Sequence, residues 1–129
     1  EKNSDDYATT ADVLLEVIDR YKSLGYEYQY LSCIYPTAPF LTGDKIELAM
    51  KVLKDNKCNS VLPVVKYSYP IQRSLKIKDG KIVMNFPDNY LKRSQDLEDS
   101  YHDCGQFYCI KVNDFVKQKS LSTKNKNSL

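Results

Sequence analysis

The chain has 129 residues, of which 42% are hydrophobic and 28% charged, a balance that fits one globular domain. Its formal net charge of +2 gives no reason to propose nucleic acid or a membrane as a partner. No secretory leader or long apolar span is visible, so we expect a cytoplasmic protein.

The first predicted element is a helix. Thr10 is a good N-cap, and Asp12 follows in the first turn, where the helix dipole favours an anion. Apolar residues from Val13 to Tyr21 repeat at helical spacing, and Gly25 then provides a C-terminal stop.

An apolar and aromatic run over residues 28–35 predicts a strand that is buried on both faces. The strand leads into Pro36-Thr37-Ala38-Pro39, where the two prolines stiffen the backbone. Ligands bind at this end of the strands in α/β sheets, so the loop is a candidate binding element.

A second helix is predicted after Thr42, with its apolar stripe between Ile46 and Leu53, and residues 60–65 predict another buried strand. Strand, helix and strand in succession imply a parallel, right-handed crossover. The fold class predicted from the residues is therefore α/β, with a layered sheet.

Residues 74–86 alternate apolar and polar about Asp79-Gly80, which is a strong signal for a two-residue hairpin turn. The apolar positions would share one face of the hairpin: Leu75, Ile77, Ile82 and Met84. We expect this hairpin to form a half-exposed arm.

The rest of the chain is more polar. Residues 88–103 are expected to be irregular, residues 106–112 to form a buried strand, and Asn113 to cap a short helix that ends near Lys119. Lys, Ser, Asn and Thr dominate residues 120–129, which predicts a disordered tail and leaves residues 1–119 as the domain.

Catalytic machinery is not recognisable. The four glycines lie apart, without a G-x-x-x-x-G-K or G-x-G-x-x-G motif, so the chain offers no clustered backbone N–H groups for phosphates. Glu98 and Asp99 fit solvated charges better than metal ligands, and Ser100 with His102 is weak support for a nucleophile–base pair. We assign no catalytic and no metal-binding residue.

The cysteines are expected to be reduced thiols. Cys33, Cys58, Cys104 and Cys109 match no zinc-binding spacing, and all but Cys58 lie in or beside apolar or aromatic runs.

Three segments suit binding better than bond-making. They are the loop after Tyr35, the run Tyr69–Arg73 that enters the hairpin, and the polar run Lys92–Gln95. The planar guanidinium of an arginine can donate two parallel hydrogen bonds to a carboxylate. For each segment a purely structural loop with solvated charges remains the alternative.

The order and spacing of these segments carry a resemblance. The segments are Cys33-Ile34-Tyr35-Pro36-Thr37-Ala38-Pro39-Phe40, Tyr69-Pro70-Ile71-Gln72-Arg73, Arg93-Ser94-Gln95-Asp96-Leu97 and Asp103-Cys104-Gly105-Gln106-Phe107-Tyr108. Together they resemble the bacterial acylneuraminate and pseudaminic acid cytidylyltransferases, which are CMP-sugar synthetases. The likeness covers about residues 4–119 and favours the pseudaminic acid branch over the sialic and legionaminic acid branches.

The resemblance implies a Rossmann-like, three-layer nucleotide-diphospho-sugar transferase fold, and a homodimer formed through the hairpin region 71–90. It also implies cytidylyl transfer. The anomeric hydroxyl of an acidic nine-carbon sugar attacks the α-phosphorus of CTP, and pyrophosphate leaves with the help of Mg²⁺.

Roles for individual residues follow from the same resemblance. Tyr35, Thr37 and Ala38 would form a wall against the base and sugar, and Tyr108 would lie near the sugar. Arg93, Ser94 and Gln95 would lie where relatives place an arginine on the sugar carboxylate, with either Arg93 or Ser94 at the arginine position itself. The implied substrate-binding residues are Tyr35, Thr37, Ala38, Arg73, Arg93, Ser94, Gln95 and Tyr108.

The family's phosphate loop and its aspartate-rich Mg²⁺ segment have no counterpart in this chain, which would lie between them. We therefore expect the chain alone to make no CMP-sugar. The alternative is a non-catalytic module that binds sugar acids or mediates subunit interaction.

Overall fold

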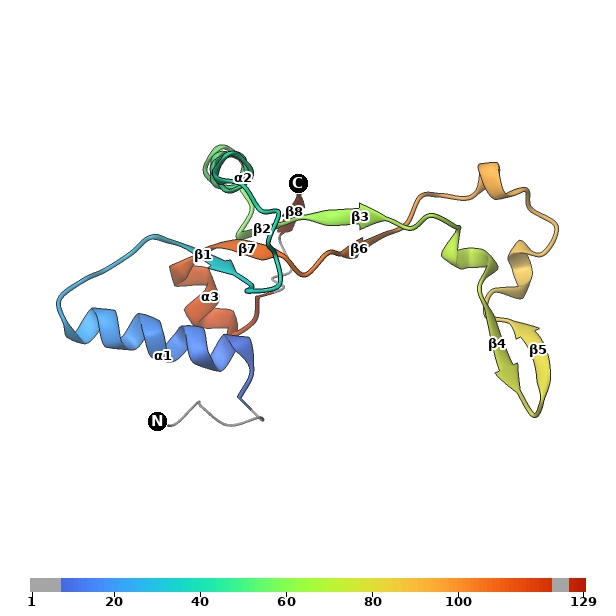
Figure 1. The fold of residues 1–129 in the computed structure, drawn as a ribbon, viewed down its shortest axis with the longest axis horizontal. Coiled ribbons are helices and arrows are strands. Elements are labelled where there is room, and N and C mark those ends of the chain that lie inside the picture. The colour runs from blue at the N-terminus through green and yellow to red at the C-terminus, as the bar shows by residue number, and fades with distance from the viewer. Residues whose placement is uncertain (1–7, 122–125) are drawn as a thin grey trace. The chain divides into compact units, whose positions relative to one another are not determined.

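The computed structural model describes residues 8–121 and 126–129, and its contacts divide the chain into two compact units (Figure 1). Unit 1 comprises residues 1–63 and 105–129, and unit 2 comprises residues 64–104. The single domain expected over residues 1–119 therefore consists of two units.

Helix α1 (Thr10–Ser23) begins one residue earlier than expected, because Thr9 and not Thr10 is its N-cap. The Thr9 hydroxyl accepts a hydrogen bond from the Asp12 backbone N–H, and the Asp12 carboxylate accepts one from the Thr9 backbone N–H. This reciprocal pair is a capping box. Gly25, at φ 86°, follows the helix as expected.

The sheet of unit 1 is mixed. Its strands lie in the order β1 (Tyr30–Ile34), β7 (Phe107–Lys111), β2 (Ser60–Leu62) and β8 (Lys126–Ser128). Strand β7 is antiparallel to both β1 and β2, so β1 and β2 run in the same direction without being neighbours. Strand β8 pairs parallel with β2.

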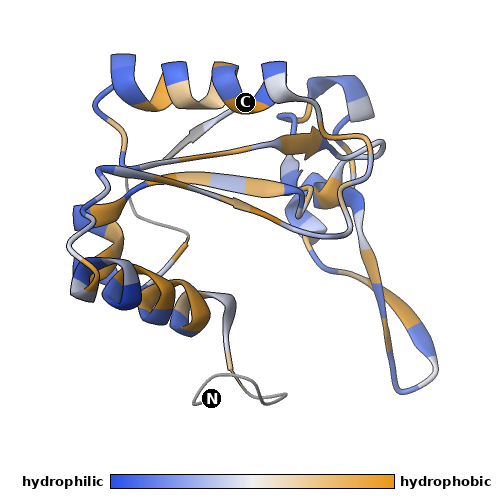
Figure 2. Cartoon of the chain, turned by 60° about the vertical axis from the view of Figure 1, so that its left-hand side comes forward, coloured by the Kyte–Doolittle hydropathy of each residue, from blue (hydrophilic) through white to orange (hydrophobic). Residues whose placement is uncertain are grey.

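Helices lie on both faces of this sheet. Figures 1 and 2 show α2 (Gly43–Asp55) over one face, and α1 with α3 (Val112–Gln118) over the other. None of the helices in residues 8–121 and 126–129 has the length and apolar character needed to span a membrane.

The core of unit 1 lies where α2 covers β2 and β7. It is a cluster of buried side chains: Ala49, Leu53, Cys58, Val61, Phe107 and Cys109. Thr42 is the N-cap of helix α2 as expected, although its side chain makes no capping hydrogen bond. The apolar stripe of α2 is therefore its main attachment to the sheet.

Two strand predictions need correction. Strand β1 is only half buried, with Ser32 and Ile34 exposed, because β7 is its one strand neighbour among the described residues. The strand predicted over residues 60–65 is interrupted at Pro63, since proline has no N–H for a β ladder. Strand β2 ends before it, and β3 (Val64–Lys66) begins a different sheet.

Unit 2 is built from two strand pairs and short turns. Strand β3 pairs antiparallel with β6 (Tyr101–Asp103), and β4 (Leu75–Lys78) pairs antiparallel with β5 (Lys81–Met84). Short 3-10 turns η1, η2 and η3 connect these pairs, at Ile71–Arg73, Pro87–Asn89 and Ser94–Asp96. The expected irregular stretch 88–103 thus contains two short turns and β6.

The predicted hairpin is confirmed. Asp79 and Gly80 have φ values of 51° and 72°, as a type I′ turn requires at both central positions. Leu75 pairs with Met84, and Ile77 pairs with Ile82, so all four apolar residues share one face.

The predicted disordered tail spans residues 120–129. Residues 122–125 lie outside the described residues, and Lys126–Ser128 is strand β8.

We expect Thr9→Ala to destabilise unit 1 by about 1 kcal/mol, because the substitution removes a side-chain N-cap. Hydrogen bonds from Thr9 hold the pKa of the Asp12 carboxyl below its ordinary value of 3.8. The contribution of the capping box should therefore be present above pH 3.8, and should disappear as the pH falls through the lower, folded pKa.

Urea unfolding monitored by circular dichroism measures this effect. Thr42→Ala is the matched control, since that N-cap makes no side-chain hydrogen bond and should cost less. Equal losses for the two variants would contradict the assignment of the capping box.

Candidate functional site

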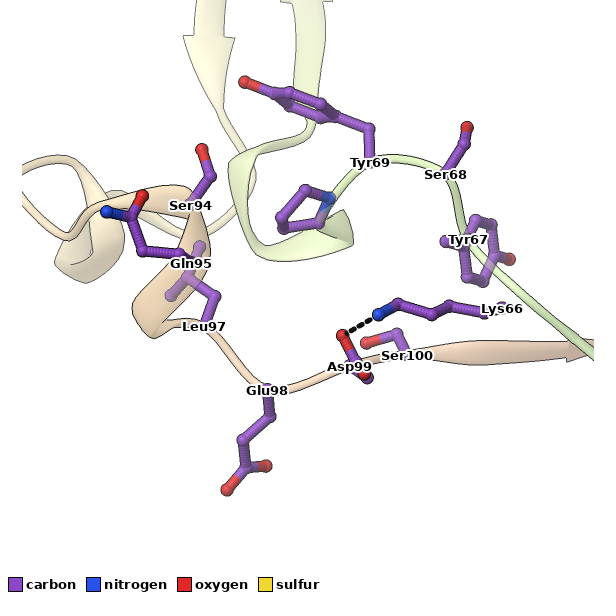
Figure 3. Close-up of a pocket in the computed structure, with 11 residues that line it drawn as sticks. Lys66, Tyr67, Ser68, Tyr69, Ser94, Gln95, Leu97, Glu98, Asp99 and Ser100 are labelled. Atoms are coloured by element: carbon purple, nitrogen blue, oxygen red, sulfur yellow. Dashed lines mark ion pairs between the residues drawn. The ribbon is translucent and has the colours of Figure 1, made fainter.

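The candidate site is a pocket of about 470 Å³ in unit 2, between the end of β3 and the start of β6. Pockets for small ligands commonly have volumes of about 300–1,000 Å³. One wall comprises Lys66–Pro70, and the other comprises Ser94, Gln95 and residues 97–100 (Figure 3).

Hydrogen bonds hold the two walls together. The Tyr67 backbone N–H donates to the Ser100 carbonyl over 2.9 Å, next to the Lys66–Tyr101 pair that ends the β3–β6 ladder. The Gln72 Nε2 donates to the Glu98 carbonyl over 3.0 Å. The site is thus positioned by strand register and by one amide side chain.

An ion pair spans the pocket. Lys66 Nζ lies 2.6 Å from Asp99 Oδ1, and Figure 3 shows the lysine reaching from one wall to the aspartate on the other. The hydrogen bond that Lys66 donates to the Asp99 carboxylate raises the pKa of Lys66, so the lysine is charged at neutral pH. Both side chains are about half exposed, so water screens the pair and its contribution to stability is small.

The other lining groups are mostly uncharged. They are hydroxyls, aromatic rings, one amide and two apolar side chains: Ser68, Ser94, Ser100, Tyr67, Tyr69, Gln95, Pro70 and Leu97. Glu98 also belongs to the lining, but in Figure 3 its carboxylate points away from the other side chains. Hydroxyls and an amide beside aromatic faces can hold a ligand that is rich in hydrogen-bonding groups.

Two of the four sequence-predicted residues in unit 2, Ser94 and Gln95, line this pocket. The two arginines are engaged elsewhere. Arg93 donates from Nε and Nη2 to both carboxylate oxygens of Asp96, over 2.8 and 3.1 Å. Arg73 Nη1 donates to the Lys92 carbonyl over 3.0 Å.

The predicted residues of unit 1 gather at the ends of β1 and β7. The rings of Tyr35 and Tyr108 meet edge to face, with centroids 5.8 Å apart. The hydroxyl of Tyr35 lies 3.1 Å from Thr10 Oγ1. Thr37 is exposed, and the Ala38 N–H donates to the Tyr35 carbonyl over 3.2 Å in the loop that follows.

Sequence reasoning missed Lys66 and placed Asp99 among the solvated acids. No motif marks either residue, and the two lie 33 positions apart in the sequence (99 − 66) and are brought together by the β3–β6 pairing. Gln72 belongs to the run Tyr69–Arg73 that the sequence marked for binding, and its buried Oε1 has no hydrogen-bond partner within the described part of the chain.

Metal-ligating side chains do not cluster among the described residues. Within residues 8–121 and 126–129, no three His, Cys, Asp or Glu side chains lie close enough to hold a metal ion. Burial raises the thiol pKa of Cys33 and Cys109. We therefore derive no step through a metal or a thiolate from this chain.

Comparison with known proteins confirms the resemblance. No family model matches the chain. A Campylobacter jejuni serotype O:2 protein named pseudaminic acid cytidylyltransferase is 36% identical over 110 residues, which cover 84% of this chain and 47% of that protein. Its serotype O:23/36 counterpart, with the same name, is 34% identical over 110 residues and equal shares.

A third relative is longer. The Helicobacter pylori protein named pseudaminic acid cytidylyltransferase and UDP-2,4-diacetamido-2,4,6-trideoxy-beta-L-altropyranose hydrolase is 25% identical over 127 residues. The match covers 98% of this chain and 24% of that protein. The chain spans about half the length of the two Campylobacter relatives that it matches.

We expect Tyr35→Phe to lower the stability of unit 1 by about 1 kcal/mol, since a part-buried hydrogen bond with Thr10 is lost. Thermal unfolding measures the change, and Tyr26→Phe, at a tyrosine that is 58% exposed, is the control. An unchanged melting temperature for Tyr35→Phe would show that this bond does not hold the tyrosine in place.

Proposed function

We propose that this chain is part of a pseudaminic acid cytidylyltransferase, which transfers CMP from CTP to an acidic nine-carbon sugar and releases pyrophosphate. The 36% identity to the Campylobacter jejuni enzyme over 84% of the chain is the observation that carries the proposal. The mixed α/β unit, with helices on both faces of its sheet, is compatible with the Rossmann-like, three-layer transferase fold.

In this reaction the oxygen of the sugar's anomeric hydroxyl forms a bond to the α-phosphorus of CTP. The bond from that phosphorus to the oxygen bridging to the β-phosphorus breaks, and the hydroxyl proton is released. Catalysis of this kind depends on placing the two substrates in line and on neutralising charge. The described residues contain no cluster of metal ligands, and their proposed contribution is to provide surfaces that place the substrates.

The proposed contributions of the chain are two binding surfaces. In unit 1, Tyr35 and Tyr108 form an aromatic wall beside Thr37 and Ala38, which we propose faces the base and sugar. In unit 2, the pocket with Ser94 and Gln95 receives part of the sugar, and Arg73 and Arg93 lie beside that segment. The phosphates and Mg²⁺ are proposed to be held by groups outside this chain.

A second copy is the proposed partner of the hairpin, through residues 71–90. Leu75, Ile77 and Ile82 are 58%, 79% and 70% exposed, and they lie together on one face. An exposed apolar face of this kind is typical of interaction surfaces, and an isolated two-stranded hairpin is only marginally stable in water. In a homodimer, the hairpin of each copy would cover the apolar face of the other.

We expect the purified chain to bind pseudaminic acid in a calorimetric titration, and to give no heat with CTP and Mg²⁺. It should also release no pyrophosphate when all three are present. Turnover of CTP by the chain alone would refute its proposed dependence on further groups. If neither ligand binds, the chain serves subunit interaction instead, which is the alternative function.

We expect the double substitution Ile77→Asp and Ile82→Asp to convert a dimer into a monomer, because two charges would be buried at the apolar face. Analytical ultracentrifugation measures the change. The control is Lys76→Gln with Lys78→Gln, which changes the opposite face of the same hairpin. A wild-type chain that sediments as a monomer at micromolar concentration would contradict the proposed arm.

A further inference from the structure

The pocket of unit 2 carries no spare positive charge. Among the described residues that line it, Lys66 is the one cation, and its ammonium is already paired with Asp99 at 2.6 Å. Glu98 adds a further negative charge to the lining. A ligand carboxylate placed beside Lys66 would also meet the Asp99 carboxylate, and like charges at such separations repel.

The neighbouring arginine does not change this balance. Arg93 is absent from the pocket lining, and its Nε and Nη2 donate to the two carboxylate oxygens of Asp96. A bidentate pair is among the stronger charge-assisted contacts. Moving Arg93 into the pocket would leave Asp96 without that partner, so Arg93 is poorly placed to neutralise a ligand there.

The uncharged lining has a definite chemical character. Gln95 provides an amide, which can both donate and accept hydrogen bonds, and Ser94 precedes it on η3 with a hydroxyl. Leu97 and Pro70 add apolar surface, and Tyr69 adds a ring. An amide with a small apolar group attached, as in an acylamino substituent, satisfies both kinds of surface at once.

We propose that this pocket recognises the uncharged acylamino and hydroxyl groups of the sugar, with Ser94 and Gln95 as specificity-determining residues, and does not bind its carboxylate. The inference rests on the proposed function and deepens it. It also changes the role expected for Ser94 and Gln95, which the family resemblance placed at the carboxylate. Asp99 occupies the Lys66 ammonium and repels a second carboxylate, so the pair disfavours binding of an acid group in the pocket.

The test compares three probes by calorimetry: pseudaminic acid, its methyl ester and its N-deacylated form. Gln95→Leu should weaken binding of the acid and of the ester by the same factor, about five- to tenfold, which corresponds to one lost hydrogen bond. For the N-deacylated form that factor should be close to one. Gln118→Leu, the same substitution at an exposed glutamine of α3, is the control and should leave all three affinities within about twofold.

A second variant tests the effect of the Lys66–Asp99 pair directly. Asp99→Asn removes the partner of Lys66 while keeping the shape of the side chain, and the half-exposed position should tolerate the change. We expect the variant to favour the acid over the ester by several-fold more than the wild type does, because Lys66 then becomes free to bind a carboxylate.

The inference is overturned if Gln95→Leu weakens binding of the acid but not of the ester, since Gln95 would then contact the carboxylate. It is also overturned if Gln95→Leu changes nothing, if Asp99→Asn leaves the acid-to-ester ratio unchanged, or if the wild-type chain binds none of the three probes. Failure of the proposed function is distinct: the binding pattern would hold, but the complete enzyme would form no CMP-sugar.

Discussion

The pairing of β7 with both β1 and β2 is the interaction on which unit 1 depends. Phe107, Cys109 and Ile110 of β7 are fully buried, and β7 is the strand through which β1 joins the core beneath α2. The same register places Cys33 opposite Tyr108, and the Tyr35 N–H then donates to the Gln106 carbonyl over 2.9 Å. The contact between Tyr35 and Tyr108 in the aromatic wall is thus a direct consequence of strand pairing.

Unit 2 is held together in a different way. No residue from 64 to 104 is buried, so the unit lacks an apolar core of its own. Backbone ladders and side-chain-to-backbone bonds maintain its shape, for example from Gln72 to Glu98 and from Arg73 to Lys92. Such bonds contribute modestly to the free energy of folding when water competes for them. A surface that covers the exposed hairpin would add the apolar burial that unit 2 lacks.

Local patterns predicted those elements that local interactions decide. Asp79-Gly80 specified the hairpin and its register, and helical spacing specified α1 and α2. The cap at Thr9 was misplaced by one residue because two threonines in succession offer the same chemistry. The half-exposed β1 and the break at Pro63 depend on which strands become neighbours, which the sequence pattern does not contain.

The candidate site shows the same division. The family resemblance indicated Ser94 and Gln95, and both line the pocket, although their roles remain predictions. It could not indicate Lys66 and Asp99, because their pairing requires β3 and β6 to meet in one particular register. The Lys66–Asp99 ion pair across the pocket is therefore a property of tertiary structure, and composition gives no hint of it.

Ligand binding and hairpin packing are connected through the course of the chain in unit 2. The chain leaves one pocket wall at Pro70, forms η1, enters the hairpin, and returns through η2 and η3 to the other wall. The Asn85 Nδ2 donates to Ser74 Oγ over 2.9 Å, and the Asn85 N–H donates to the Ser74 carbonyl over 3.0 Å, so the base of the hairpin is fixed where the two walls diverge. If the hairpin were ordered by packing against a second copy, the pocket walls would be partly ordered as well. They would then lose less conformational entropy when a sugar binds. A ligand in the pocket would in turn favour the ordered hairpin, because the coupling between the two events is reciprocal.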